Sequence, residues 1–316
     1  MKTTIERVLC PVDFSECSRQ AFDRATAVAR ACGAALTALN VIPVQTAAGI
    51  LPYAGPESLA PFPLPEVQPE RVKEALQSFL TRGAIPPIAV TYDVTEAPDV
   101  HREILAHAAR RRADVIVVGT HGRSGVHRLI LGSIAEKVLR RAPVPVLTVP
   151  PAAADAVATG AEPFRRVLCA LDFSACSLLG LQFATAFAAE HHARLAVLHV
   201  AEVAPVGYDP FIGPPTDLAR LKSAAEIVMR DRLHEAIPSV DRSALYIEEI
   251  VVAGTPHREI VRIAREWCAD LIVLGIHGRS GLGRAAFGST VEPVVRHAAC
   301  PVLTMRTDAQ ACVAAA

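Results

Sequence analysis

An internal duplication constrains this chain more than any other feature of its sequence. Each half of the 316 residues opens with an apolar segment that runs into Asp-Phe-Ser, and each half later carries His-Arg-Glu-Ile followed by a glycine-rich stretch. The period is far longer than that of solenoid repeats, which is roughly 20–50 residues. The chain is therefore two copies of one domain. The matching segments are VLCPVDFSECS (8–18) and VLCALDFSACS (167–177), HREILAHAARRRADVIVVGTHGRSG (101–125) and HREIVRIAREWCADLIVLGIHGRSG (257–281), and PVPVLTV (143–149) and ACPVLTM (299–305).

The repeat sets the expected domain organisation. Copy one is assigned to residues 1–150 and copy two to residues 164–306, and residues 307–316 form a short tail. The segment between the copies, 151–163, is rich in Ala and lacks periodicity, as expected for a linker. Apolar residues make up 51% of the chain, so each copy can bury a core of its own.

Within each copy, short apolar runs alternate with segments of helical periodicity. This alternation predicts an α/β fold, with a doubly wound (Rossmann-like) five-stranded parallel sheet in each copy that is covered by helices on both faces. Such sheets bind ligands at the carboxyl ends of their strands. Pro-rich stretches at 43–69 and 204–216 interrupt the pattern and are candidate lids or partner loops. In copy one we expect strands at 7–12, 36–42, 88–94, 115–118 and 144–149, and helices at 15–32, 71–82, 101–111 and 133–141.

Composition excludes several classes of partner. Lys plus Arg equal Asp plus Glu at 32 each, so there is no bulk electrostatic case for nucleic acid or anionic lipid. No apolar run reaches the roughly 18 residues that a membrane span needs, and the N-terminus lacks a signal-peptide layout. We therefore expect a cytoplasmic protein without a membrane partner.

The eight cysteines are scattered singly, with no Cys-x-x-Cys pair, so a zinc site is not expected. Cys17 and Cys176 recur at one repeat position, early in a predicted helix, where a thiol pKa can be lowered. An ordinary reduced thiol is the simpler interpretation of both.

The glycine-rich stretch begins where a strand is predicted to end and closes where a helix begins. Backbone N–H groups and the helix dipole favour an anion at such a place, and glycine lets the backbone approach a ligand closely. An arginine inside the stretch could add charge-assisted contacts to phosphate. The spacing matches neither the P-loop nor G-x-G-x-x-G, and a purely structural loop remains the alternative. The residues are Gly119, Gly122, Arg123 and Gly132 in copy one, and Gly275, Gly278, Arg279 and Gly288 in copy two.

Three pairs of polar residues at equivalent repeat positions have two interpretations each. Ser133 and Ser289 could face phosphate or could be the serines of Ser-x-x-Glu capping boxes. The acidic residues that end the first strands, Asp13 and Asp172, could contact a ribose or adenine amine or could cap the next helix. The loop histidines, His121 and His277, lack a nucleophile or carboxylate placed beside both, so we interpret them as shaping the site rather than catalysing a reaction. A fourth pair, Asp114 and Asp270, is expected to bond locally to backbone.

Together these segments resemble the universal stress protein family, with two UspA-type domains of its ATP-binding branch. The carriers are VLCPVDFS and VLCALDFS, the ADVIVVGTHGRSG and ADLIVLGIHGRSG stretches with their later Gly-Ser pairs, and the PVPVLTV and CPVLTM ends. The resemblance implies that Asp13 and the Val41 backbone meet adenosine in copy one, with the glycines, Arg123 and Ser133 meeting ribose and phosphates. The copy-two equivalents are Asp172, Val200, Gly275, Gly278, Arg279, Gly288 and Ser289.

The resemblance also implies a function. ATP, accompanied by Mg²⁺, would serve nucleotide-linked regulation in stress resistance, with at most feeble hydrolysis, so the protein is not expected to be an enzyme. A weak ATP hydrolase or nucleotidyl-transfer enzyme and a nucleotide-free interaction scaffold are the alternatives.

The last strand of each copy carries a proline, Pro145 and Pro301, which suits an edge strand. By resemblance, these strands pair within the chain to form an intrachain pseudo-dimer, and two chains could associate further as a homodimer.

The two candidate sites are expected to be unequal. Pro98 stands opposite Gly254, which is free to take positive φ, so copy two is expected to bind more tightly. This holds although copy two has Ile276 for Thr120 and Pro293 for Lys137.

Overall fold

The structure is a computed structural model that describes residues 5–44, 68–81, 88–121, 131–151, 164–202, 218–237, 245–276 and 289–306. The tail at 307–316, nearly all of the linker and most of the two Pro-rich stretches lie outside these residues.

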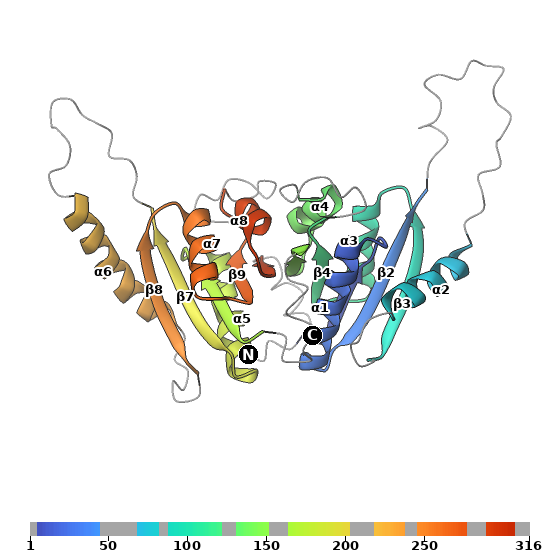
Figure 1. Cartoon of the computed structure of the whole chain (residues 1–316), viewed down its shortest axis with the longest axis horizontal. Coiled ribbons are helices and arrows are strands. Elements are labelled where there is room, and N and C mark those ends of the chain that lie inside the picture. Colours follow the sequence, from blue (N-terminus) through green and yellow to red (C-terminus); the bar gives the residue numbers. More distant parts are fainter. Residues whose placement is uncertain are drawn as a thin grey trace, which may run out of the picture.

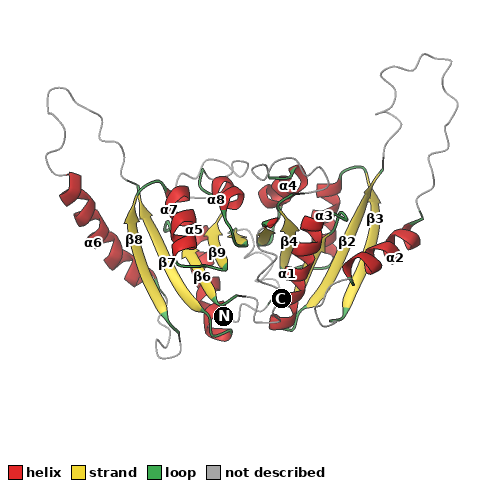
Figure 2. Ribbon diagram, viewed as in Figure 1, coloured by secondary structure: helices red, strands yellow, loops and turns green. Residues whose placement is uncertain are grey.

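Both copies consist of alternating strands and helices, as predicted (Figures 1 and 2). The observed ends differ from the expected ones by at most a few residues. Copy one contains β1 (Arg7–Pro11), α1 (Glu16–Cys32), β2 (Ala35–Pro43), α2 (Pro69–Leu80), β3 (Val90–Ala97), α3 (Val100–Arg110), β4 (Val115–Gly119), α4 (Ser133–Arg141) and β5 (Val146–Val149). Copy two contains β6 (Arg166–Ala170), α5 (Ala175–Glu190), β7 (Arg194–Ala201), α6 (Leu218–Ala236), β8 (Ile247–Ala253), α7 (Pro256–Glu266), β9 (Leu271–Gly275), α8 (Val291–His297) and β10 (Val302–Met305).

The strands form one sheet in the order β3-β2-β1-β4-β5-β10-β9-β6-β7-β8. Within each copy every pairing is parallel, and the order of strands reverses between β1 and β4 and between β6 and β9. This is a doubly wound arrangement, and the predicted α/β fold is confirmed. The reversal points are the places where such sheets bind ligands.

The two copies meet through their last strands. β5 and β10 pair antiparallel, with Leu147 opposite Leu303 in the register. The buried Thr148 hydroxyl donates to the Val302 carbonyl at 3.1 Å, and the Thr304 hydroxyl donates to Val146 at 3.2 Å. The join is therefore a continuation of the sheet.

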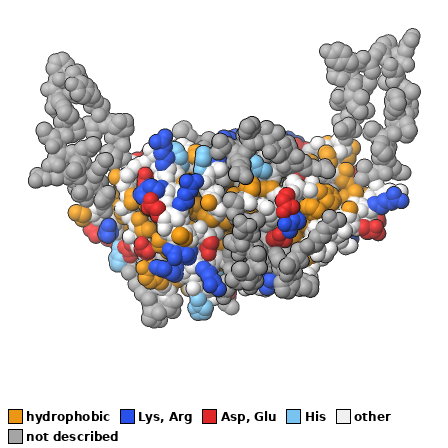
Figure 3. All heavy atoms as spheres, viewed as in Figure 1, with side chains coloured by type: hydrophobic (Ala, Val, Ile, Leu, Met, Phe, Trp, Pro, Cys, Tyr) orange, Lys and Arg blue, Asp and Glu red, His pale blue; other side chains and the backbone are white. Residues whose placement is uncertain are grey.

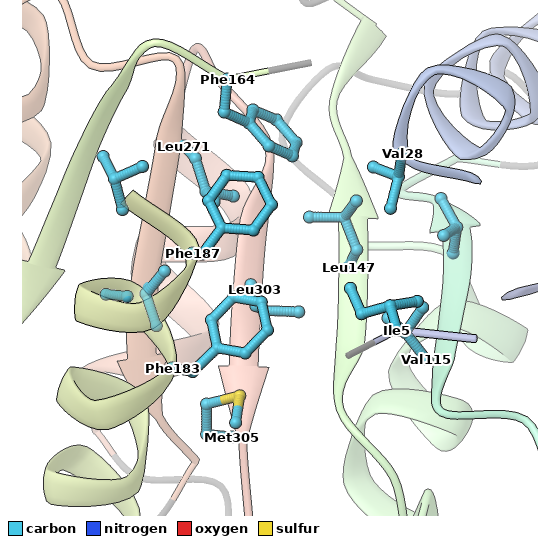
Figure 4. Packing of buried hydrophobic residues seen from close by; sticks show 14 of the residues in the cluster. Ile5, Val28, Val115, Leu147, Phe164, Phe183, Phe187, Leu271, Leu303 and Met305 are labelled. Atoms are coloured by element: carbon cyan, nitrogen blue, oxygen red, sulfur yellow. The ribbon is translucent and has the colours of Figure 1, made fainter. Parts of the chain in front are cut away.

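Two apolar clusters lie on opposite faces of the sheet, and each contains residues of both copies. Side chains of α1, α2, α5 and α6 contribute to one cluster, and side chains of α3, α4, α7 and α8 contribute to the other. Successive residues of a strand alternate between them, because Val8 and Cys10 belong to the first cluster and Leu9 to the second. Figure 4 shows Leu147 and Leu303 where the first cluster crosses the join.

Acidic and basic side chains are interspersed over the face drawn in Figure 3, in line with the balanced charge of the sequence. Among the helices that the structure describes, none combines the length and apolar character that a membrane crossing requires.

Asp114 and Asp270 bond to backbone N–H groups, as expected, but these groups are distant in sequence rather than local. Asp114 accepts from the N–H groups of Glu6 and Arg7 at 2.9 and 2.8 Å, more than a hundred residues away in sequence. Asp270 does the same for Arg165 and Arg166. Each carboxylate thus anchors the start of its copy to the neighbouring strand.

Candidate functional site

A cavity of about 360 Å³ opens at the carboxyl ends of the strands in copy one. It lies at the reversal between β1 and β4, where the fold class predicts a ligand. Five of the residues predicted to contact a nucleotide line it, together with an apolar wall from β2 and α3. The five are Asp13, Val41, Gly119, Gly132 and Ser133, and the wall consists of Leu39, Val41, Val100 and Ile104.

The first-strand aspartate is held in a tight turn. Asp13 Oδ1 accepts from the Ser15 backbone N–H at 3.0 Å and from the Ser15 hydroxyl at 2.5 Å. Ser15 in turn accepts from the Ser18 N–H and is the N-cap of α1, so the alternative that Asp13 caps the helix is wrong. The residue between them, Phe14, has φ of 64°, a sparsely populated conformation for a side chain of this size. The turn places the carboxylate at the cavity.

Copy two repeats this turn. Asp172 Oδ1 accepts from the Ser174 N–H at 2.9 Å and from its hydroxyl at 2.6 Å, Phe173 has φ of 64°, and Ser174 caps α5. Because the same uncommon φ recurs at both repeat positions, the Asp-Phe-Ser sequence specifies the turn locally.

The capping-box interpretation of Ser133 is wrong. Gly132 is the N-cap of α4, and its carbonyl accepts the first helical bond from the Glu136 N–H at 2.8 Å. Ser133 is therefore the first helical residue, and Glu136 is paired with Arg140. The Gly132 N–H also donates to the Thr120 carbonyl at 2.8 Å, which ties the start of α4 to the end of β4. The first turn of α4 lies at the cavity wall, where its unpaired N–H groups favour an anion.

His121 also lines the cavity. Its Nδ1 lies 2.9 Å from the Thr120 hydroxyl oxygen. Its Nε2 is buried and has no hydrogen-bond partner among the residues that the structure describes. Buried polar atoms are usually paired, so this nitrogen is a candidate contact for a ligand.

The structure explains why glycine occupies positions 119 and 275, which the sequence did not reveal. A Cβ on Gly119 would lie 2.8 Å from Cys17 Sγ and 2.9 Å from the Cys17 carbonyl oxygen. A Cβ on Gly275 would lie 2.6 Å from the Ser177 backbone nitrogen. Each glycine therefore allows the start of α1 or α5 to pack against the end of a strand. Burial raises the pKa of the Cys17 thiol, so the suggested lowering by the helix N-terminus is not found there.

Helices α3 and α4 of copy one are joined by His101, which is buried. Arg141 Nη1 lies 2.8 Å from its Nε2, and Asp99 pairs with its Nδ1. Since a guanidinium can only donate, Nε2 is the acceptor and the proton of the neutral ring sits on Nδ1. Burial lowers the pKa of His101, against the effect of Asp99.

Two features of copy two bear on the expectation that it binds more tightly than copy one. Gly254 does not adopt positive φ, and the space at its α-carbon faces Glu259. Ser289 is not a cap, because α8 begins at Val291 with Thr290 as the N-cap. Pro293 is therefore the third residue of α8. The positive φ considered for Gly254 is not found, and tighter binding by copy two stays untested.

Several predicted residues cannot be placed. Gly122, Arg123, Gly278, Arg279, Gly288 and His277 lie outside the described residues. In copy two, Asp172 follows β6, Val200 and Gly275 lie in the last residues of β7 and β9, and Ser289 precedes α8.

Comparison with known proteins agrees with the fold. A model of the universal stress protein family matches residues 4–150 and 163–306. Universal stress protein Rv2005c of Mycobacterium tuberculosis is 30% identical over 197 residues, which cover 61% of this chain and 62% of that protein, less than two thirds of its length. Universal stress protein Rv1996 of the same organism is 25% identical over 318 residues, covering 95% of this chain and 94% of that protein.

Solved structures show the same arrangement. The crystal structure of a universal stress protein from Archaeoglobus fulgidus matches with a TM-score of 0.60 at 21% identity, over 96% of this chain and 97% of that one. At this identity the likeness shows the fold alone. The two family matches together span most of the sequence, and the chain belongs to the universal stress protein family as a tandem of two of its domains.

Proposed function

We propose that copy one binds an adenine nucleotide, ATP with Mg²⁺, in the cavity at the β1–β4 reversal. One observation carries the proposal. All the copy-one candidate residues that the structure describes line this one cavity, although they come from four separate parts of the chain.

The residues present fit such a ligand. A cavity of about 360 Å³ falls within the roughly 300–1,000 Å³ of small-molecule sites. The apolar wall of β2 and α3 suits a planar base, with Asp13 and the Val41 backbone as polar contacts beside it. Ser133 and the rest of the first turn of α4 offer N–H groups to phosphates, whereas the Gly132 N–H already donates to the Thr120 carbonyl. When bound, ATP would bring its Mg²⁺ and supply the phosphates that these residues contact.

We propose a regulatory role in the stress response rather than an enzymatic one. The two titratable side chains of the cavity wall already have partners within the fold. Asp13 is engaged by Ser15, and Nδ1 of His121 lies beside the Thr120 hydroxyl. The two hydroxyls beside them have structural partners of their own, because Ser15 accepts from the Ser18 N–H as the cap of α1 and the buried Thr120 hydroxyl lies 3.4 Å from the Val149 carbonyl. We therefore expect turnover well below about 1 s⁻¹, the lower end of typical enzyme rates.

The test is calorimetric titration of Mg-ATP, with ADP, AMP and Mg-GTP for comparison and mass spectrometry of nucleotide released from purified protein. The decisive variant is Ser133→Glu. An acidic residue in the first turn of α4 favours the helix, so folding is retained while the carboxylate repels phosphate. Affinity should fall by about tenfold or more, because like charges brought together cost several kcal/mol.

Ser289→Glu is the matched control, since it places the same charge at the same repeat position in copy two. Binding that is absent from the wild type would favour the scaffold alternative. Binding that survives Ser133→Glu unchanged would show that nucleotide does not occupy this cavity. Steady turnover above about 1 s⁻¹ would favour the hydrolase alternative.

A further inference from the structure

The helix that follows the glycine stretch differs between the copies. In α4 the first helical bond joins the Glu136 N–H to Gly132, and in α8 it joins the Val294 N–H to Thr290. Gly132 corresponds to residue 288, so the first bond of α8 lies two residues later along the repeat. The cause is Pro293, which stands at the position of Lys137 and has no N–H to continue a longer helix. The helix start in copy two has therefore moved away from the position that contacts the cavity in copy one.

The other end of α4 is held by copy two. Arg306 follows β10, and its Nη1 donates to the Arg140 carbonyl at 2.5 Å and to the Ala142 carbonyl at 3.5 Å. Its side chain is buried, with only 7% of the residue exposed. The last carbonyls of a helix have no partner within it, and a cation there is favoured by the helix dipole. Arg306 thus supplies the C-terminal cap of α4 from the other copy.

No reciprocal contact is available to α8 from the matching position. The residue of copy one that corresponds to Arg306 is Pro150, whose side chain has no donor. The His297 carbonyl of α8 instead accepts from Arg265 of its own copy, in an exposed contact of 3.3 Å. Copy two therefore caps the last helix of copy one, and copy one does not cap the last helix of copy two from the matching position.

We propose that the two copies have different roles. Copy one binds the nucleotide, and copy two supports that site through Arg306, which acts as a positioning residue. The proposal rests on the proposed function. Because α4 has nine residues, it is a rod of about 14 Å with the cavity at one end and Arg306 at the other. Anchoring its last turn to the join restricts the orientation of its first turn.

The first experiment needs no nucleotide. Amide hydrogen exchange of the full chain is compared between the wild type, Arg306→Ala, Arg306→Lys and Arg262→Ala. Arg262 is the matched control, because it is a half-exposed arginine on α7 whose ion pairs within the described residues are with Glu259 and Glu266 of its own helix. Arg306→Ala should speed exchange in α4 by about fivefold or more and leave α8 unchanged, whereas Arg306→Lys should keep most of the protection. Unchanged exchange in α4 would overturn the positioning role.

The second experiment is Mg-ATP titration of the same variants at a temperature where all are folded. Arg306→Ala should weaken binding by about fivefold or more, within the range seen for residues that couple sites indirectly. Lysine should restore most of the affinity, and Arg262→Ala should have no effect. Equal affinity in Arg306→Ala and wild type would overturn the proposal while leaving the proposed function intact.

The number of nucleotides bound per chain tests directly whether copy one alone binds nucleotide. The wild type should bind one nucleotide per chain, Ser289→Glu should still bind one, and Ser133→Glu should bind none with comparable affinity. Two equivalent sites, of which each variant removes one, would refute the single-site assignment. Absence of binding in the wild type would refute the proposed function itself, and the exchange experiment would still decide whether Arg306 holds α4.

Discussion

Replacing Gly119 with alanine should test how closely α1 packs against the floor of the cavity. The added Cβ would lie 2.8 Å from Cys17 Sγ, 2.9 Å from the Cys17 carbonyl oxygen and 3.0 Å from its carbonyl carbon. Two of these atoms are backbone at the start of α1 and cannot rotate away. Overpacking of this kind costs typically about 1–3 kcal/mol of stability. A change of 1 kcal/mol corresponds to a fall in Tm of about 2–4 °C for a domain of 150–250 residues.

The copies offer a matched comparison, because the clashing atoms differ. In copy two, a Cβ on Gly275 would lie 2.6 Å from the Ser177 backbone nitrogen and 2.8 Å from Cys176 Cβ. Cys17→Ala removes the sulfur that clashes in copy one, so it should relieve part of the cost of Gly119→Ala. Cys176→Ala keeps the Cβ and the backbone, so it should relieve none of the cost of Gly275→Ala.

The assay is equilibrium unfolding in urea of both double-mutant cycles, which separates the coupling from the cost of each cysteine change. The midpoint should shift without a large change of slope. A cost of Gly119→Ala below about 0.5 kcal/mol, the usual range for surface changes, would refute the close approach. Equal rescue by the two cysteine changes would show that sulfur contact is not the cause in copy one.

Three further outcomes follow from the same contacts. Burial lowers the pKa of His101 in the folded state, so the stabilisation by its neutral ring is complete above the pKa of the unfolded chain, about 6.5, and is lost as pH falls below that value. Urea unfolding at pH 8 and at pH 5 should therefore show that His101→Gln loses less stability between the two pH values than the wild type does. Burial raises the pKa of Cys169 to about 12, whereas Cys268 is exposed, so iodoacetamide at pH 8 should label Cys268 and spare Cys169 in the folded protein, as read by peptide mass spectrometry. The double change of Thr148 and Thr304 to valine removes two buried hydrogen bonds across the β5–β10 join and should cost roughly 1–3 kcal/mol in urea unfolding with an unchanged far-ultraviolet spectrum.

Much of the fold could be predicted from the sequence, because it depends on patterns repeated in both copies. Apolar strands separated by helices determine a parallel, doubly wound sheet, and such a sheet brings the carboxyl ends of its strands to one edge. Asp13, Val41 and Gly119 lie at strand ends, so the topology alone places them beside one another. The Asp-Phe-Ser turn is also local, since the same φ of 64° recurs at Phe14 and Phe173.

The roles of individual residues at the site were predicted less well, because they depend on where a helix begins. Ser133 matches a capping box in sequence, yet the backbone conformation of Gly132 makes glycine the N-cap. The space at Gly119 is occupied by α1, which the sequence could not place against β4. Neither outcome can be found from spacing, since each requires the packing of elements that are distant along the chain.

The sequence by itself determined that there are two copies, which fold each adopts and which edge of the sheet carries the candidate residues, because hydrophobic periodicity and turn chemistry are local. Only the tertiary structure decided how the copies differ. The contact of Arg306 with the Arg140 carbonyl spans 166 residues and follows no sequence motif. It exists because antiparallel pairing of β5 with β10 brings the end of one copy to the helix of the other, where the unpaired carbonyls of a helix end favour a buried cation.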